Sequence, residues 1–129
     1  MAKMVCIIVG LIFLLIGIVG FFSPSFLGFH LSVMHSIIHL LTAAASFYFG
    51  FASSLNAARI FAIIFGAVYF LLGILGFVAP DVVANILQAH QVRGGTHNLT
   101  PDNILNLIIG AVFLASAVIR EPMTAATSK

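Results

Sequence analysis

Long apolar stretches alternate with short polar segments along this chain of 129 residues. The apolar stretches cover four ranges, residues 4–22, 31–51, 58–79 and 101–119. A helix needs about 20 apolar residues to cross the hydrocarbon core of a bilayer. Each range therefore predicts one membrane-spanning helix, and residues 1–129 are expected to form a single four-span membrane domain.

The first and third predicted spans share a sequence pattern. Residues 10–24 read GLIFLLIGIVGFFSP and residues 66–80 read GAVYFLLGILGFVAP, at an offset of 56. The spans that follow align more loosely, with SIIHLLTA at 36–43 matching NILNLIIG at 103–110, at an offset of 67. The pattern indicates an internal repeat of a two-span hairpin, and both hairpins must insert in the same direction. The predicted fold is all-α, an integral membrane four-helix bundle of two like-oriented helical hairpins.

The repeated glycines have the spacing of a helix-packing face. Positions i, i+7 and i+10 fall within about one quadrant of a helix at about 100° per residue. A glycine groove lets a neighbouring helix approach closely, which favours association of helices in lipid. We therefore expect helix packing at six positions: Gly10, Gly17, Gly20, Gly66, Gly73 and Gly76.

The segment between the third and fourth spans carries a helical pattern of its own. Within PDVVANILQ, at about residues 80–88, the apolar side chains Val82, Val83, Ile86 and Leu87 recur at helical spacing. This spacing predicts a short amphipathic helix that lies on the membrane interface.

Basic residues are distributed unevenly about the four predicted spans. Only Arg93 lies on one side of the membrane path, whereas the other side holds Lys3, Arg59, Arg120 and Lys129. Loops rich in lysine and arginine stay in the cytoplasm. We therefore expect a multi-pass protein of the bacterial inner (plasma) membrane with both termini in the cytoplasm.

Composition supports a membrane protein and excludes several classes of function. Hydrophobic residues make up 62% of the chain and charged residues only 6%, against about 25% charged in soluble domains. Membrane lipid is therefore the expected surrounding. The net charge of +2 gives no basis for nucleic-acid binding, and a single cysteine, Cys6, cannot form an internal disulfide.

The polar side chains within the spans form the candidate site. His35 and His39 lie four residues apart on the second span, and the repeat aligns Asn103 and Asn106 with Ser36 and His39. Asp102 precedes these asparagines at the start of the fourth span, where a carboxylate complements the helix dipole. Because hydrocarbon offers no polar partners, the polar faces should turn toward protein, with His39 and Asn106 meeting across the bundle.

Three roles are open for this polar cluster. Imidazole and amide groups can hydrogen-bond between helices, at about 0.6 kcal/mol per contact. His35 and His39 can also chelate a divalent metal, with Asp102, His90 or His97 completing the site. Haem would need a histidine on the opposite helix, and that place holds Asn106. A pH-sensing role for the histidines also stays open.

No enzyme or coupled transporter is indicated. The middle of each span lacks Asp, Glu, Lys and Arg, which proton-driven or ion-coupled transport usually requires. No nucleophile–base arrangement or phosphate loop is present either. The expected role is structural or accessory, as a subunit or assembly partner that packs against other membrane proteins or self-associates, without a cofactor. The alternative is a metal- or haem-binding membrane protein that uses its histidines.

Several motifs resemble those of a known family. They are the repeated Gly-x2-Gly-Phe, the IIHLL of the second span, the Ala58-Arg59 entry to the third span, and the Asp102-Asn103 opening of the fourth. The chain resembles, over residues 9–119, a family of small bacterial four-helix membrane proteins classed as a domain of unknown function, the one numbered four-three-eight-three. The resemblance implies the fold and no activity. The family's last motif typically continues to a histidine, as in Asp-Asn-x2-His, where this chain has Asn106.

Overall fold

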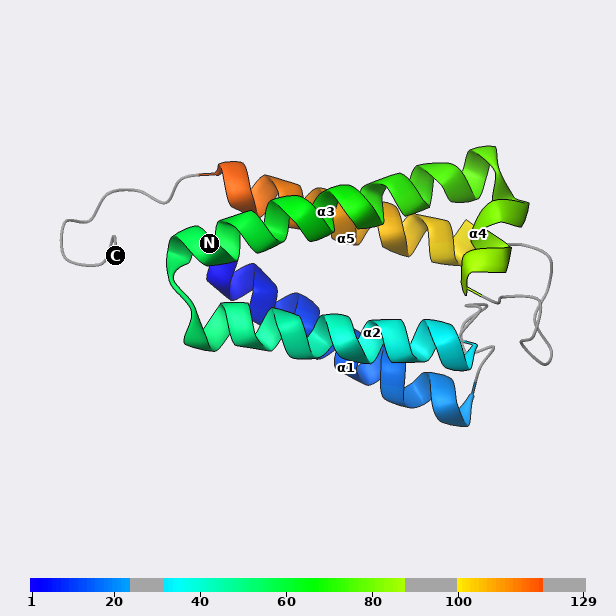
Figure 1. The fold of residues 1–129 in the computed structure, drawn as a ribbon, viewed down its shortest axis with the longest axis horizontal. Helices are drawn as coiled ribbons and strands as arrows, with labels where there is room; N and C mark the ends of the chain where they lie inside the picture. Colours follow the sequence, from blue (N-terminus) through cyan, green and yellow to red (C-terminus); the bar gives the residue numbers. More distant parts are fainter. Residues whose placement is uncertain (24–31, 88–99, 120–129) are drawn as a thin grey trace.

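The computed structural model describes residues 1–23, 32–87 and 100–119, and these residues are almost entirely helical (Figure 1). The elements are α1 (Ala2–Phe22), α2 (Val33–Phe47), the π-helix η2 (Tyr48–Ala52), α3 (Leu55–Val78), α4 (Pro80–Leu87) and α5 (Thr100–Val118). Four helices are long and apolar enough to cross a membrane: Ala2–Phe22, Val33–Ala52, Leu55–Val78 and Thr100–Val118. The predicted all-α class and the four long apolar helices are confirmed.

Serine caps explain where two of the long helices begin. The Ser32 side chain accepts a hydrogen bond from the backbone N–H of His35 at 3.1 Å, and α2 starts directly after it. Ser54 accepts from the N–H of Ala57 at the same distance and starts α3 at Leu55. Such caps satisfy backbone N–H groups that have no partner inside the helix. α3 begins before the apolar span expected from about residue 58, because apolar content alone does not reveal a cap.

Pro80 separates α3 from α4. Proline has no backbone N–H and disfavours helical geometry at the residue before it, and Ala79 is non-helical, with φ of −137°. Proline is well suited to the first position of the next helix, and α4 begins there and covers Pro80–Leu87 of the predicted 80–88, while residue 88 lies outside the described residues. Val83 of α4 is buried, whereas Val82 and Ile86 are about half exposed.

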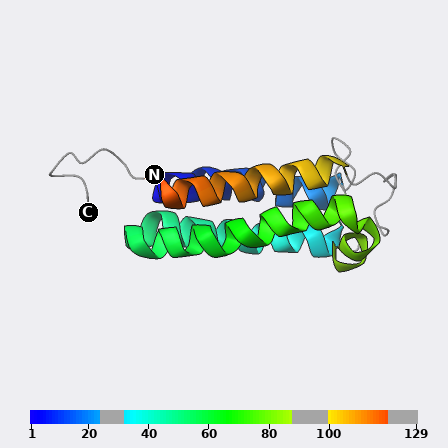
Figure 2. The same ribbon diagram turned by 90° about the horizontal axis from the view of Figure 1, so that it is seen from above.

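The four long helices pack as two pairs. α1 makes most of its contacts with α2, and α3 makes most of its contacts with α5. Figure 1 shows the two pairs one above the other, and in Figure 2 α1 and α5 share one layer and α2 and α3 the other. Contacts between the pairs are fewer, and α1 makes most of them, with α3 and α5. Close packing is therefore concentrated within each pair.

Glycines allow this close packing. A Cβ placed at Gly10 would lie 3.1 Å from the Phe47 ring, and one at Gly17 would lie 2.7 Å from the Leu40 side chain. In the second pair, a Cβ at Gly66 would lie 2.9 Å from Leu114 Cγ. Separations this short leave no room for a larger residue, so the helices approach where side chains are missing.

The last two repeated positions lie at the end of the bundle that carries α4. The side chain of Asn103 occupies the space that a Cβ on Gly76 would need. Gly20 is buried on α1. All six glycines of the repeated pattern therefore lie inside the bundle, on the faces by which α1 and α3 meet other helices.

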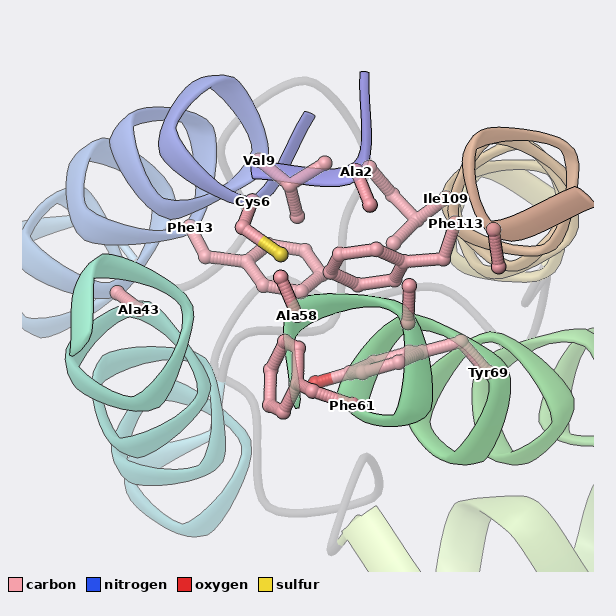
Figure 3. Packing of buried hydrophobic residues seen from close by; sticks show 12 residues of the cluster. Ala2, Cys6, Val9, Phe13, Ala43, Ala58, Phe61, Tyr69, Ile109 and Phe113 are labelled. Atoms are coloured by element: carbon pink, nitrogen blue, oxygen red, sulfur yellow. The ribbon is translucent and has the colours of Figure 1, made fainter. Parts of the chain in front are cut away.

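The apolar core lies toward the end of the bundle where the chain begins. Figure 3 shows Phe13 and Phe113 pointing toward each other from α1 and α5, with Phe61 of α3 beside them. The rings of Phe61 and Phe113 meet edge to face with centroids 5.6 Å apart, a favourable arrangement for aromatic pairs. Small buried residues fill the space around the rings: Ala2, Cys6, Ala58, Ala62 and Ala117.

Gly73→Leu is expected to destabilise the bundle. A Cβ at Gly73 would lie 2.6 Å from Leu107 Cγ and 2.9 Å from the Leu107 backbone nitrogen. Overpacking costs about 1–3 kcal/mol or more, so the midpoint of thermal unfolding in detergent should fall. Val68→Leu on the exposed face of α3 adds bulk without a clash and serves as the control. An unchanged midpoint for Gly73→Leu would contradict the packing role of this glycine.

Candidate functional site

A group of buried polar side chains lies at the α4 end of the bundle. We call this group the polar layer. It comes from three helices, because α2 and α5 both begin at this end and α3 ends there (Figure 1). All its members are buried: His35, Ser36, His39 and Thr42 on α2, Tyr69 on α3, and Asp102, Asn103 and Asn106 on α5.

His39 is enclosed by aromatic groups. Its side chain is 0% exposed, and its ring stacks on Phe13 of α1 with centroids 4.7 Å apart and planes 5° from parallel. The ring of His35 also lies beside it, with centroids 4.2 Å apart and planes tilted by 58°. The pair at i and i+4 thus points into the bundle, as the helical spacing predicted.

A hydrogen bond joins the two helix pairs at Tyr69. The Tyr69 hydroxyl lies 2.7 Å from Thr42 Oγ1, and either oxygen can donate. The Tyr69 ring also contacts Phe13 with centroids 5.2 Å apart. Sequence reasoning did not single out Tyr69. One feature of the sequence could have identified it. Tyr69 is the repeat equivalent of Phe13, and its hydroxyl, which Phe13 lacks, lies inside a span and requires a hydrogen-bond partner.

Several polar atoms of the layer are buried without a partner. Across residues 1–23, 32–87 and 100–119, no hydrogen bond is made by Ser36 Oγ, either ring nitrogen of His39, Asn103 Oδ1 or Asn106 Nδ2. No hydrogen bond therefore joins the His39 ring to Asn106, and the expected meeting of these two residues across the bundle stays a prediction. The contact that the structure shows for the His39 ring on this side is its stacking on Phe13. A buried polar group left unsatisfied costs about 1–3 kcal/mol, so these atoms require an explanation.

Asp102 and Asn103 occupy the first turn of α5. Asp102 is an acidic residue in that turn and is buried, so its carboxylate lies near the positive end of the helix dipole, as expected. The structure places Asn103 against Gly76 and keeps Asn106, 2% exposed, one turn deeper.

The described residues do not form a complete metal centre. A zinc-type site needs three or four ligands, and in the described part of the chain no three His, Cys, Asp or Glu side chains come together as such a group. His35 and His39 are adjacent, but Asp102 does not complete a set of three with them. The other candidates, His90 and His97, lie outside the described residues.

The Thr42–Tyr69 hydrogen bond is expected to show coupling in a double-mutant cycle with Thr42→Val and Tyr69→Phe. Interhelical hydrogen bonds in membranes contribute about 0.6 kcal/mol on average, with a maximum of about 1.7. Unfolding free energies in detergent should show non-additivity of that size. Tyr48→Phe, at an exposed tyrosine, is the matched control and should have no effect. Fully additive changes would mean that the two hydroxyls do not stabilise the bundle together.

One comparison with known proteins is informative for this arrangement. No curated protein and no solved structure matches the chain significantly. A family model matches residues 3–119, which is nearly the whole chain and includes all four long helices and the polar layer. The family is described as a domain of unknown function, and it is the one that the repeated glycines and the second-span histidines indicated. The chain therefore belongs to the DUF4383 family.

Proposed function

We propose that this multi-pass membrane protein has a structural or accessory role and acts by packing in the bilayer against other membrane-spanning helices or further copies of itself. One observation carries the proposal. The outward faces of the long helices consist of large aliphatic side chains, whereas the polar side chains of the spans turn inward. Exposed examples occur on three helices: Leu15 on α1, Ile64 and Leu71 on α3, and Ile108 on α5.

Four of the repeated glycines face helices of the same chain and so do not provide a docking face for a partner. Gly10 and Gly17 lie against α2, while Gly66 and Gly73 lie against α5. Their close approach is used within the chain, so a partner would contact the exposed Ile, Leu and Val side chains. Such contacts give packing energy without a hydrophobic driving force, since lipid is equally apolar.

We also propose that the bundle consists of two like-oriented helical hairpins that arise from an internal repeat. Contacts at corresponding positions of the two hairpins support this. Gly10 faces Ala43 and Phe47, and Gly66 faces Gly110 and Leu114. Adding 56 to the number of the α1 residue and 67 to the numbers of the α2 residues gives the corresponding residues of α3 and α5. These are the same offsets that align the sequences.

We also propose that the termini are cytoplasmic in a bacterial inner membrane. Lys3 near the start of α1 and Arg59 near the start of α3 support this orientation, because both helices begin at the end of the bundle opposite α4 (Figure 1). The α4 end with the polar layer then faces outward.

Metal or haem binding through His35 and His39 is the second candidate. The adjacent rings favour it. The described residues supply two imidazoles, and the repeat equivalent of His39 on α5 is Asn106 rather than histidine. Purified protein that contains stoichiometric metal or shows a Soret band would establish this alternative, and His35→Ala should then reduce metal or haem content.

Photo-crosslinking in cells tests the accessory role. A photoreactive residue at exposed Leu15, Ile64, Leu71 or Ile108 should give a reproducible crosslink to one protein, or to a second copy, from at least one position. The same residue at Phe113, which is fully buried, is the matched control and should give none. Crosslinks only to lipid from all four exposed positions would contradict the proposal.

A further inference from the structure

The interior of the bundle has two chemically different halves. The half near α4 contains the polar layer, whereas the opposite half contains the aromatic rings and alanines of the apolar core. Phe13 marks the boundary, because its ring stacks on His39 and lies within the apolar core. We call Phe13, Phe61 and Phe113 the aromatic barrier. Figure 3 shows these rings filling the centre between α1, α3 and α5.

The unpartnered atoms on the α4 side of the barrier include both donors and acceptors. A neutral imidazole has one donor and one acceptor nitrogen, a serine hydroxyl is both, an amide nitrogen donates and an amide oxygen accepts. These roles belong to His39, Ser36, Asn106 and Asn103. All four side chains are more than nine-tenths buried. A ligand that satisfies them must therefore both donate and accept hydrogen bonds.

The surroundings also restrict the size and charge of that ligand. The His39 ring stacks on Phe13 and lies against the tilted ring of His35, so a ligand must reach the nitrogens between these neighbours. A metal ion is disfavoured because the part of the chain that the structure describes brings no third metal-ligating side chain to the histidines. A small, uncharged ligand therefore fits these surroundings best.

We propose that the polar layer is a binding site for water. Ordered water molecules supply the hydrogen bonds that the His39 imidazole and Ser36 hydroxyl of α2 and the Asn103 and Asn106 amides of α5 lack among the described residues. Water has two donors and two acceptors, and a buried water typically makes about three hydrogen bonds to protein groups. The water enters from the α4 end and stops at the aromatic barrier. The bundle interior is thus hydrated from one side only.

Ser46 gives an internal comparison for the one-sided arrangement. It is on the same helix as Ser36, is equally buried, and its hydroxyl also has no partner among the described residues. Ser46 lies seven residues beyond His39 along α2, at the repeat equivalent of Phe113, and among the described residues it is the one side chain outside the polar layer with such an atom. A buried water needs two or more polar partners, so Ser46 should stay dry. This hydration does not depend on the accessory role proposed above.

Solid-state NMR of the full chain in lipid bilayers tests the proposal, with transfer of polarisation from water as the probe. The His39 ring nitrogens, the Asn106 amide and Ser36 Cβ should receive polarisation several-fold faster than Phe113 and Ser46 Cβ. A His39 signal as slow as that of Phe113 would overturn the water site. Equally fast transfer to Ser46 and Ser36 would overturn the barrier.

A variant adds a second measurement on the same site. His39→Phe should preserve stacking on Phe13 while it removes both nitrogens, and it also identifies the His39 signals. Transfer of polarisation from water to Ser36 and Asn106 should then fall several-fold. Unchanged transfer in a folded variant would show that His39 is not part of the water site. If the variant does not fold, the wild-type comparison of Ser36 with Ser46 decides the question.

Discussion

Close approach of helices at glycine is the contact on which the rest of this structure depends. Lipid is as apolar as the aliphatic side chains, so association of helices must come from packing and polar contacts. Gly10 and Gly17 bring α1 onto α2, and Gly66 and Gly73 bring α3 onto α5. The two resulting pairs position the aromatic core at one end of the bundle and the polar layer at the other.

The polar layer is the exceptional part of this interior. Polar groups inside a membrane protein are costly, and those that are kept commonly mark functional sites. Thr42 and Tyr69 satisfy each other across the two pairs. His39 and Asn106 do not, although both are buried as deeply as the phenylalanines of the core. Within the described ranges their hydrogen-bonding capacity is unmet, and this distinguishes the α4 end from ordinary helix packing.

Much of this fold could be predicted because lipid makes the sequence signals simple. Long apolar runs predicted the four long helices, and the glycines predicted which faces are buried. The caps at Ser32 and Ser54, by contrast, depend on single side-chain hydrogen bonds that hydropathy does not report. The position of His39 could not be predicted either. The repeat indicated how far along the second span His39 lies. Its stacking on Phe13, however, depends on side-chain packing in three dimensions.

The unequal packing within and between the helix pairs has a mechanical consequence. Each pair is held along its length by backbone approach at glycine, whereas the pairs meet mainly through α1 and through side chains such as Tyr69. Each pair therefore behaves as a stiff unit, and the seam between the units is the softest part of the bundle. Separation along that seam would expose the polar layer first to lipid, without unfolding any helix.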